Sequence, residues 1–163
     1  MNLSNFNLKK AKGFTLIELL VVIAILAVLL SITLIAINPA RQFAQANNTQ
    51  RRSDVSTLLN AINQYMIDNN GDTPTGVSAC TSSAPCTLSN DSGIAGSLDI
   101  CSALVSQYVA ALPVDPTDGT GSPVSDCSTG TYNTGYTIYQ GSDNRLTVAA
   151  PGAELSETIQ VTR

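Results

Sequence analysis

Apolar residues dominate one long stretch near the start of the chain. From Phe14 to Ile37 the sequence contains 24 residues, and Glu18 is the single charged side chain among them. A helix rises about 1.5 Å per residue, so this stretch is long enough to cross a hydrocarbon layer roughly 30 Å thick. An apolar surface that continues round the whole helix is typical of a membrane span. We therefore predict a transmembrane helix over residues 14–37.

The pattern changes after Pro39. Further apolar residues recur at spacings of three and four, at Val55, Leu58, Leu59, Ile62, Tyr65 and Met66. This spacing predicts one buried helical face. No glycine occurs between Pro39 and Asn69, whereas Ala, Gln, Arg and Leu favour a helix. Because proline bends a helix, we predict one long helix over 14–69 that is kinked at Pro39. Its charged residues are expected to point outward, namely Arg51, Arg52, Asp54 and Asp68.

The remainder of the chain predicts a small domain. Residues 70–131 are rich in Ser, Thr and Gly and are expected to form a disulfide-pinned loop region, with a short helix at about 98–112. Alternating β-branched and aromatic residues predict strands at 135–140, 145–149 and 158–162, within an antiparallel sheet over 132–163. Three strands alone are weakly stable, so the apolar helical face must cover them. The predicted fold class is α+β, with a long N-terminal helix packed on a small antiparallel sheet.

All four cysteines lie in this downstream part, at Cys80, Cys86, Cys101 and Cys127. An even number after an export-type N-terminus predicts two disulfides formed in an oxidising compartment, with three possible pairings. Cys80–Cys86 together with Cys101–Cys127 is the favoured pairing, because each bond closes neighbouring loops. A zinc site is disfavoured, since the chain lacks a C-x-x-C pair and has no histidine.

Charge is divided unevenly along the chain. The first 13 residues hold Lys9, Lys10 and Lys12 and no acid, so residues 14–163 carry a net charge of −7. Lysines just before an apolar span place the N-terminus on the cytoplasmic side. The acidic remainder argues against a nucleic-acid-binding surface. Without histidine there is no Ser-His-Asp or Cys-His arrangement, and no phosphate-binding glycine loop follows a strand, so we expect no enzymatic activity.

The apolar stretch has a second interpretation as an ordinary secretory signal, cut after Ala46. The apolar region of such a signal normally has 7–15 residues, which is much shorter than the run seen here. Glu18 also requires an explanation, because a carboxylate within a membrane span costs roughly 2–3.5 kcal/mol at its centre. Glu18 either lies shallow enough to reach headgroup water or meets a protein partner.

The segment from Lys12 to Val22, Lys-Gly-Phe-Thr-Leu-Ile-Glu-Leu-Leu-Val-Val, resembles the N-terminal processing and methylation motif of type IV pilins and type II secretion pseudopilins. The resemblance extends over roughly residues 9–66. It implies that a prepilin peptidase removes the leader, residues 1–13, between Gly13 and Phe14, and that the Phe14 amine is then methylated. It also implies that Glu18 engages the N-terminus of a neighbouring subunit, and that the membrane-embedded assembly machinery of a pilus or secretion system acts on the chain.

A second element, Leu112-Pro113-Val114-Asp115-Pro116, resembles one that precedes the sheet in major pseudopilins, although the usual following Trp-Gly is absent. In some pseudopilins this neighbourhood binds calcium, and Asp115, Asp118 and Asp126 offer oxygen ligands for it. The sequence is equally typical of a plain solvated turn, which is the favoured interpretation. No other cofactor is expected.

Together these features favour a structural subunit of a type IV pilus-like filament. Its precursor would be a single-pass membrane protein with a cytoplasmic N-terminus, surrounded by lipid until it polymerises with copies of itself at the cell surface. One alternative is a pseudopilin of a type II secretion or DNA-uptake machine. Another, from a different class, is a membrane-anchored extracellular binding module that never polymerises.

Overall fold

The chain folds as two compact units, Met1–Pro39 and Ala40–Arg163. The computed structural model describes residues 13–128 and 130–163. The predicted leader therefore lies outside the described residues, except for Gly13.

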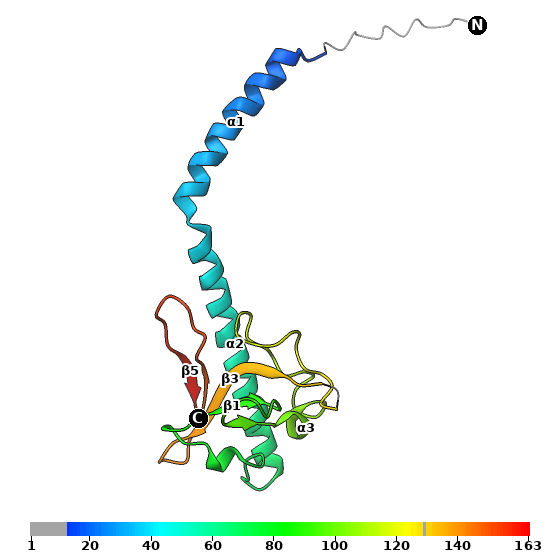
Figure 1. The fold of residues 1–163 in the computed structure, drawn as a ribbon, viewed down its shortest axis with the longest axis vertical. Helices are drawn as coiled ribbons and strands as arrows, with labels where there is room; N and C mark the ends of the chain where they lie inside the picture. The colour runs from blue at the N-terminus through cyan, green and yellow to red at the C-terminus, as the bar shows by residue number, and fades with distance from the viewer. Residues whose placement is uncertain (1–12, 129) are drawn as a thin grey trace, which may run out of the picture. The chain divides into compact units, whose positions relative to one another are not determined.

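The first unit contains α1, Leu16–Ile37 (Figure 1). Thr15 caps its start, because the Thr15 hydroxyl accepts a hydrogen bond from the backbone N–H of Glu18 at 3.3 Å. The helix ends at Asn38, whose φ of 46° is left-handed. Asparagine tolerates this conformation, and the Pro39 ring disfavours a right-handed helical conformation in the residue before it.

The next helix is α2, Pro39–Asp68, and the second unit begins at its second residue, Ala40. Proline fits the first position of a helix, where its missing N–H has no partner to lose. The sequence predicted one kinked helix over 14–69, whereas the structure has two helices separated by Asn38. After Asp68 the chain turns at Asn70 and Gly71, both with positive φ, and the Gly71 N–H donates to the Met66 carbonyl at 2.7 Å.

A five-stranded sheet follows, in the order β2-β1-β3-β4-β5. Its strands are β1 Cys86–Ser89, β2 Ser97–Leu98, β3 Asn133–Gln140, β4 Leu146–Ala150 and β5 Ile159–Thr162. The last three strands lie where alternation predicted them and pair antiparallel. β1 pairs antiparallel with β3 but parallel with β2. The prediction of a sheet confined to 132–163 is therefore wrong, since two strands come from the predicted loop region.

Short helices complete the domain. A 3₁₀ turn, η1, covers Val77–Ala79, and α3 covers only Cys101–Leu104. The predicted helix over 98–112 is thus limited to four residues. The physical reason is local: Val105 is extended and Ser106 has a φ of 73°, so the helix cannot continue past Leu104.

The core lies between α2 and the sheet. The predicted helical face is buried, with Val55, Leu58 and Ile62 inaccessible to solvent. These side chains form one cluster with apolar residues of the sheet and loops, among them Leu88, Leu104, Leu112, Ile138 and Val148. The α+β fold class predicted from the sequence is confirmed.

Candidate functional site

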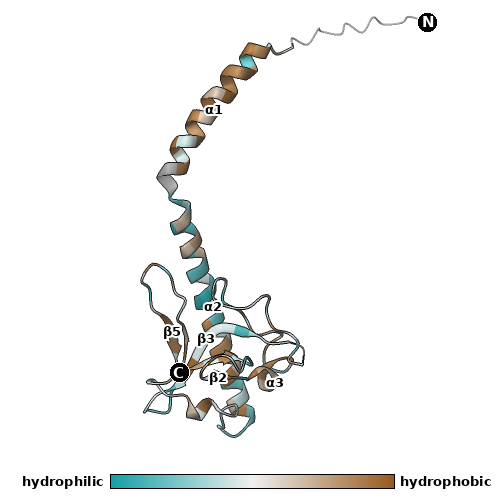
Figure 2. Ribbon diagram, viewed as in Figure 1, coloured by the Kyte–Doolittle hydropathy of each residue, from teal (hydrophilic) through white to brown (hydrophobic). Residues whose placement is uncertain are grey.

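The helix α1 exposes an apolar surface on all sides. Its stretch Leu16–Leu34 is the one helix among the described residues that is long and apolar enough to cross a membrane, and none of it is buried within the protein. Figure 2 shows this helix in apolar colours over almost its whole length. Two hydroxyls within it are satisfied internally, because Ser31 donates to the Ala27 carbonyl at 2.8 Å and Thr33 to the Leu30 carbonyl at 2.9 Å. Such bonds suit a water-free environment.

Glu18 lies in the first turn of α1. Thr15 and Glu18 have the spacing of a capping box, and a carboxylate at this position is favoured by the partial positive charge of the helix start. Within the described part of the chain, however, the Glu18 carboxylate has neither a hydrogen-bond partner nor an ion pair. Phe14 is also exposed. Pairing between the Phe14 amine and Glu18 of neighbouring copies stays a prediction, because a single chain contains no neighbour.

A buried ionic network links α2 to two distant loops. Arg51 is fully buried, although the sequence predicted it to point outward. Its Nε and Nη2 atoms bind the two Asp115 carboxylate oxygens at 2.7 and 3.0 Å. Its Nη1 binds Glu154 at 2.9 Å and Asn48 at 3.0 Å, and Nη2 also binds Thr117 at 2.6 Å. All five N–H groups of the guanidinium therefore have an acceptor.

Asp115 is positioned by the turn that contains it. Its Oδ1 accepts hydrogen bonds from the backbone N–H groups of Thr117 at 2.9 Å and Asp118 at 3.0 Å. Gly119 and Gly135 let the backbone approach this turn closely: a Cβ on Gly119 would lie 2.9 Å from the Asp115 backbone, and one on Gly135 would lie 2.7 Å from the Asp115 Cβ. The lack of a side chain at Gly119 and at Gly135 therefore leaves room for the turn that contains Asp115.

Electrostatics in the network favour the charged forms. Burial alone would raise the pKa of Asp115, but hydrogen bonds from Arg51 and from the two amides outweigh it and lower the pKa to about 2. The Asp115 hydrogen bond is also the largest cause that raises the pKa of Arg51. Both groups therefore remain ionised at neutral pH, and each neutralises the other inside the domain.

The position of Asp115 corrects one expectation. The predicted solvated turn is wrong for Asp115, which is 2% exposed. Asp126 serves a local turn instead, in which its Oδ1 accepts from the Ser128 N–H at 2.9 Å. No group of three or more His, Cys, Asp or Glu side chains that could hold a metal occurs among the described residues. The cation beside Asp115 is the Arg51 guanidinium.

The outward placement of Arg51 could have been corrected from the sequence. Arg51 lies four residues before Val55 and seven before Leu58, so it continues the buried stripe toward the start of α2. Ala44 and Asn48, which are also buried, lie on the same stripe. Toward the start of α2, the buried face therefore includes polar residues as well as apolar ones.

A second polar link lies next to the first. The Tyr136 hydroxyl on β3 donates to Asp54 Oδ2 on α2 at 2.7 Å, and Gln50 donates to Asp54 Oδ1 at 2.9 Å. Burial raises the pKa of Asp54, and burial together with the Asp54 hydrogen bond raises the pKa of Tyr136. Asp54 was also predicted to point outward, and that prediction is wrong because only 5% of it is exposed.

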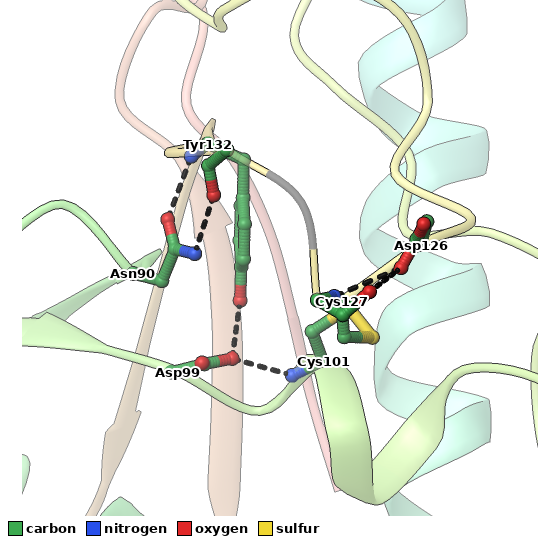
Figure 3. The surroundings of a disulfide bond; sticks show 8 residues. Asn90, Asp99, Cys101, Asp126, Cys127 and Tyr132 are labelled. Carbon is green, nitrogen blue, oxygen red and sulfur yellow. Dashed lines mark hydrogen bonds between the residues drawn. A yellow bond between two sulfur atoms is a disulfide. The ribbon is translucent and has the colours of Figure 1, made fainter.

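Two disulfides close the loops of the domain, Cys80–Cys86 and Cys101–Cys127, in the pairing that the sequence favoured. Figure 3 shows the surroundings of the second bond. There the Tyr132 hydroxyl donates to Asp99 at 2.7 Å, and the same Asp99 oxygen accepts the Cys101 N–H at 2.9 Å. Tyr132 thus links its own segment to the residues that precede α3.

The network predicts a pH dependence of stability. Because the pKa of Asp115 is about 2 in the folded state and about 3.9 in an unfolded chain, its contribution of roughly 2–3 kcal/mol is present above pH 4 and lost as the pH falls toward 2. Asp54 acts in the opposite direction, since its folded pKa is raised. Urea unfolding of residues 40–163 between pH 7 and 2 should therefore show a smaller acid-induced loss in Asp115→Asn than in the parent. Equal losses in both proteins would contradict this assignment.

Comparison with known proteins identifies the N-terminal segment. Residues 8–34 match the family described as the prokaryotic N-terminal methylation motif. The chain is also similar to the type IV wide pilus major component PilA4 of Thermus thermophilus, with 41% identity over 63 residues. That match covers 39% of this chain and 47% of PilA4, so the chain spans about half of the length of this curated relative. No solved structure matches the chain significantly.

The chain therefore carries a prokaryotic N-terminal methylation motif and is similar over 63 residues to a type IV pilus component. The matched motif overlaps the stretch Leu16–Leu34, which is long and apolar enough to cross a membrane.

Proposed function

We propose that this chain is a structural subunit of a type IV pilus-like filament that assembles through α1. A prepilin peptidase would cut between Gly13 and Phe14, after which the Phe14 amine would be methylated. The observation that carries the proposal is an apolar helix with no buried part over Leu16–Leu34 and, near its start, an acid that has no partner among the described residues. Other copies of the helix could bury this surface in the filament, as lipid would before assembly.

The proposed pairing gives the Glu18 carboxylate a partner of opposite charge. Cleavage after Gly13 would create a cationic amine at Phe14, four residues from Glu18. Opposite charges at about 4 Å attract by several kcal/mol in a layer of low dielectric. Between neighbouring copies, the pair would fix the axial register, much as one buried polar group fixes the register of a coiled coil. The membrane assembly machinery of a pilus is the other partner that this function requires. The proposed function of the chain requires no metal or cofactor.

Glu18→Ala tests the pairing. Loss of an attraction worth several kcal/mol should reduce the filaments sheared from producing cells by more than about tenfold, since roughly 1.4 kcal/mol corresponds to tenfold in an equilibrium constant. Negative-stain electron microscopy and immunoblotting of the sheared fraction provide the measurement. Ser31→Ala is the matched control, because it removes a polar group that α1 already satisfies internally. Normal filaments in Glu18→Ala would refute the pairing.

A deletion of Gly13 separates this function from a membrane-anchored binding module. A pilus subunit should lose processing and therefore filaments, whereas an anchored module should remain displayed on the cell surface. Surface labelling of the intact cells distinguishes the two results. Display without any filament in the parent protein would favour the anchored module.

A further inference from the structure

Few large apolar side chains are exposed in the second unit. Among its described residues, the exposed ones are Phe43, with 69% of its surface exposed, Ile67 with 78% and Leu155 with 44%. Phe43 lies in the first turns of α2 and Ile67 in the last turn, so these two occupy opposite ends of the helix. Leu155 lies in the loop between β4 and β5.

Leu155 occupies a backbone position that does not suit leucine. Leu155 and Ser156 have φ values of 59° and 58°, and the Glu157 N–H donates to the Glu154 carbonyl at 3.2 Å. A turn with two positive φ angles favours Gly, Asn or Asp, because a branched side chain crowds the backbone there. Folding therefore gains little from leucine at this position. A conformation of this kind is common where a side chain is presented for binding.

The turn is held beside α2 by polar contacts (Figure 1). Asn48 Nδ2 donates to the Glu154 carbonyl at 2.8 Å, and the Glu154 N–H donates to Asn48 Oδ1 at 2.9 Å. Asn47 Nδ2 also donates to the Glu154 carboxylate at 2.9 Å. Phe43 lies one helical turn before Asn47 and on the same face of α2. Phe43 and Leu155 are thus presented at the same end of the domain, and the network that contains Arg51 fixes the turn that carries Leu155.

We propose that Phe43 and Leu155 form a contact surface for a second copy of this chain within the filament, an inference that rests on the proposed function. Only Asn38 and the first turn of α2 separate the apolar span from Phe43 in the sequence. This continuity in sequence with the helix proposed for assembly argues that a second copy of this chain is the occupant of the surface. Burial of both side chains against the neighbour would add to the contacts made by α1.

Leu155→Asn tests the surface in the full chain. Asparagine tolerates a positive φ, so the melting temperature of the detergent-solubilised protein should stay unchanged or rise. The yield of sheared filaments should nevertheless fall at least about tenfold, since a buried leucine contributes enough to change an association constant by that factor. Phe43→Ser should reduce the yield similarly. Ile67→Ser, an equally exposed site at the other end of α2, is the control and should assemble normally.

A photo-crosslinking amino acid at position 155 identifies the occupant. Illuminated filaments should yield an adduct of two copies of this chain, and the same probe at position 67 should yield much less. Normal assembly of Leu155→Asn, equal loss in Ile67→Ser, or an adduct with a different protein would overturn the inference. If the parent chain forms no filaments at all, the proposed function itself fails. Parent filaments that tolerate Leu155→Asn refute only the contact surface.

Discussion

Arg51→Ala should lower the free energy of unfolding of the domain, residues 40–163, by about 3–5 kcal/mol. The substitution leaves the Asp115 carboxylate buried without its cation, because both of its oxygens bind the Arg51 guanidinium. It also removes the partner of Glu154 and Thr117. Urea unfolding followed by circular dichroism measures the loss. Since the stability of a domain this size is commonly about 5–15 kcal/mol, this loss would be a substantial part of the total.

Arg52→Ala is the matched control for this experiment. Arg52 is the next residue of α2 and forms an ion pair with Glu157, but more than half of its side chain is exposed. Exposed ion pairs contribute at most about 1 kcal/mol. The double variant Arg51→Ala with Asp115→Ala should lose less stability than the sum of the two single variants, because it removes the buried Asp115 carboxylate together with its cation. Equal losses for Arg51→Ala and Arg52→Ala would show that the network does not hold the loops on α2.

Replacing Cys101 and Cys127 together by alanine should lower the free energy of unfolding by about 3.5 kcal/mol, because this bond closes a loop with a sequence separation of 26. Loss of this bond gives the unfolded chain more conformational freedom than loss of the bond that closes the shorter loop. The loop that carries Cys127 would also lose its covalent link to α3. Thermal and urea unfolding of residues 40–163 provide the measurement, with the intact protein as reference.

The Cys80 and Cys86 pair supplies the control for loop length. Its bond has a sequence separation of 6, for which the same loop entropy amounts to about 2.2 kcal/mol. Both bonds have one fully buried cysteine, Cys80 or Cys101, so the loss of packing should be similar. If removal of Cys80–Cys86 lowered the free energy of unfolding more than removal of Cys101–Cys127, the prediction that Cys101–Cys127 stabilises the domain more would be contradicted.

The parts of the fold that the sequence predicted are those encoded by local patterns. The apolar run to Ile37, the three-and-four spacing from Val55 to Met66 and the alternation in the last three strands all lie within short stretches of chain. The disulfide pairing followed from closing neighbouring loops. Glu18 could be singled out because a lone charge in an apolar helix has no local explanation apart from the helix cap.

The parts that were missed depend on distant partners. Arg51 is an ordinary surface residue by composition, and its partner Asp115 lies 64 residues away. β1 is a short polar strand, Cys86–Ser89, that forms because β3 offers it an edge to pair with. The short helix α3 cannot continue because Ser106 adopts a positive φ. No local sequence pattern predicts this conformation.

The most direct test of the central claim is the intact mass of the subunit in filaments sheared from producing cells, combined with sequencing of its N-terminus. The chain has no lysine outside the first 13 residues, so the amine of Phe14 would be the single primary or secondary amine of a mature subunit and can be labelled selectively. We predict a polypeptide that begins at Phe14 and carries one additional methyl group on that amine. A subunit that begins at Met1 or at Asn47 would contradict the account.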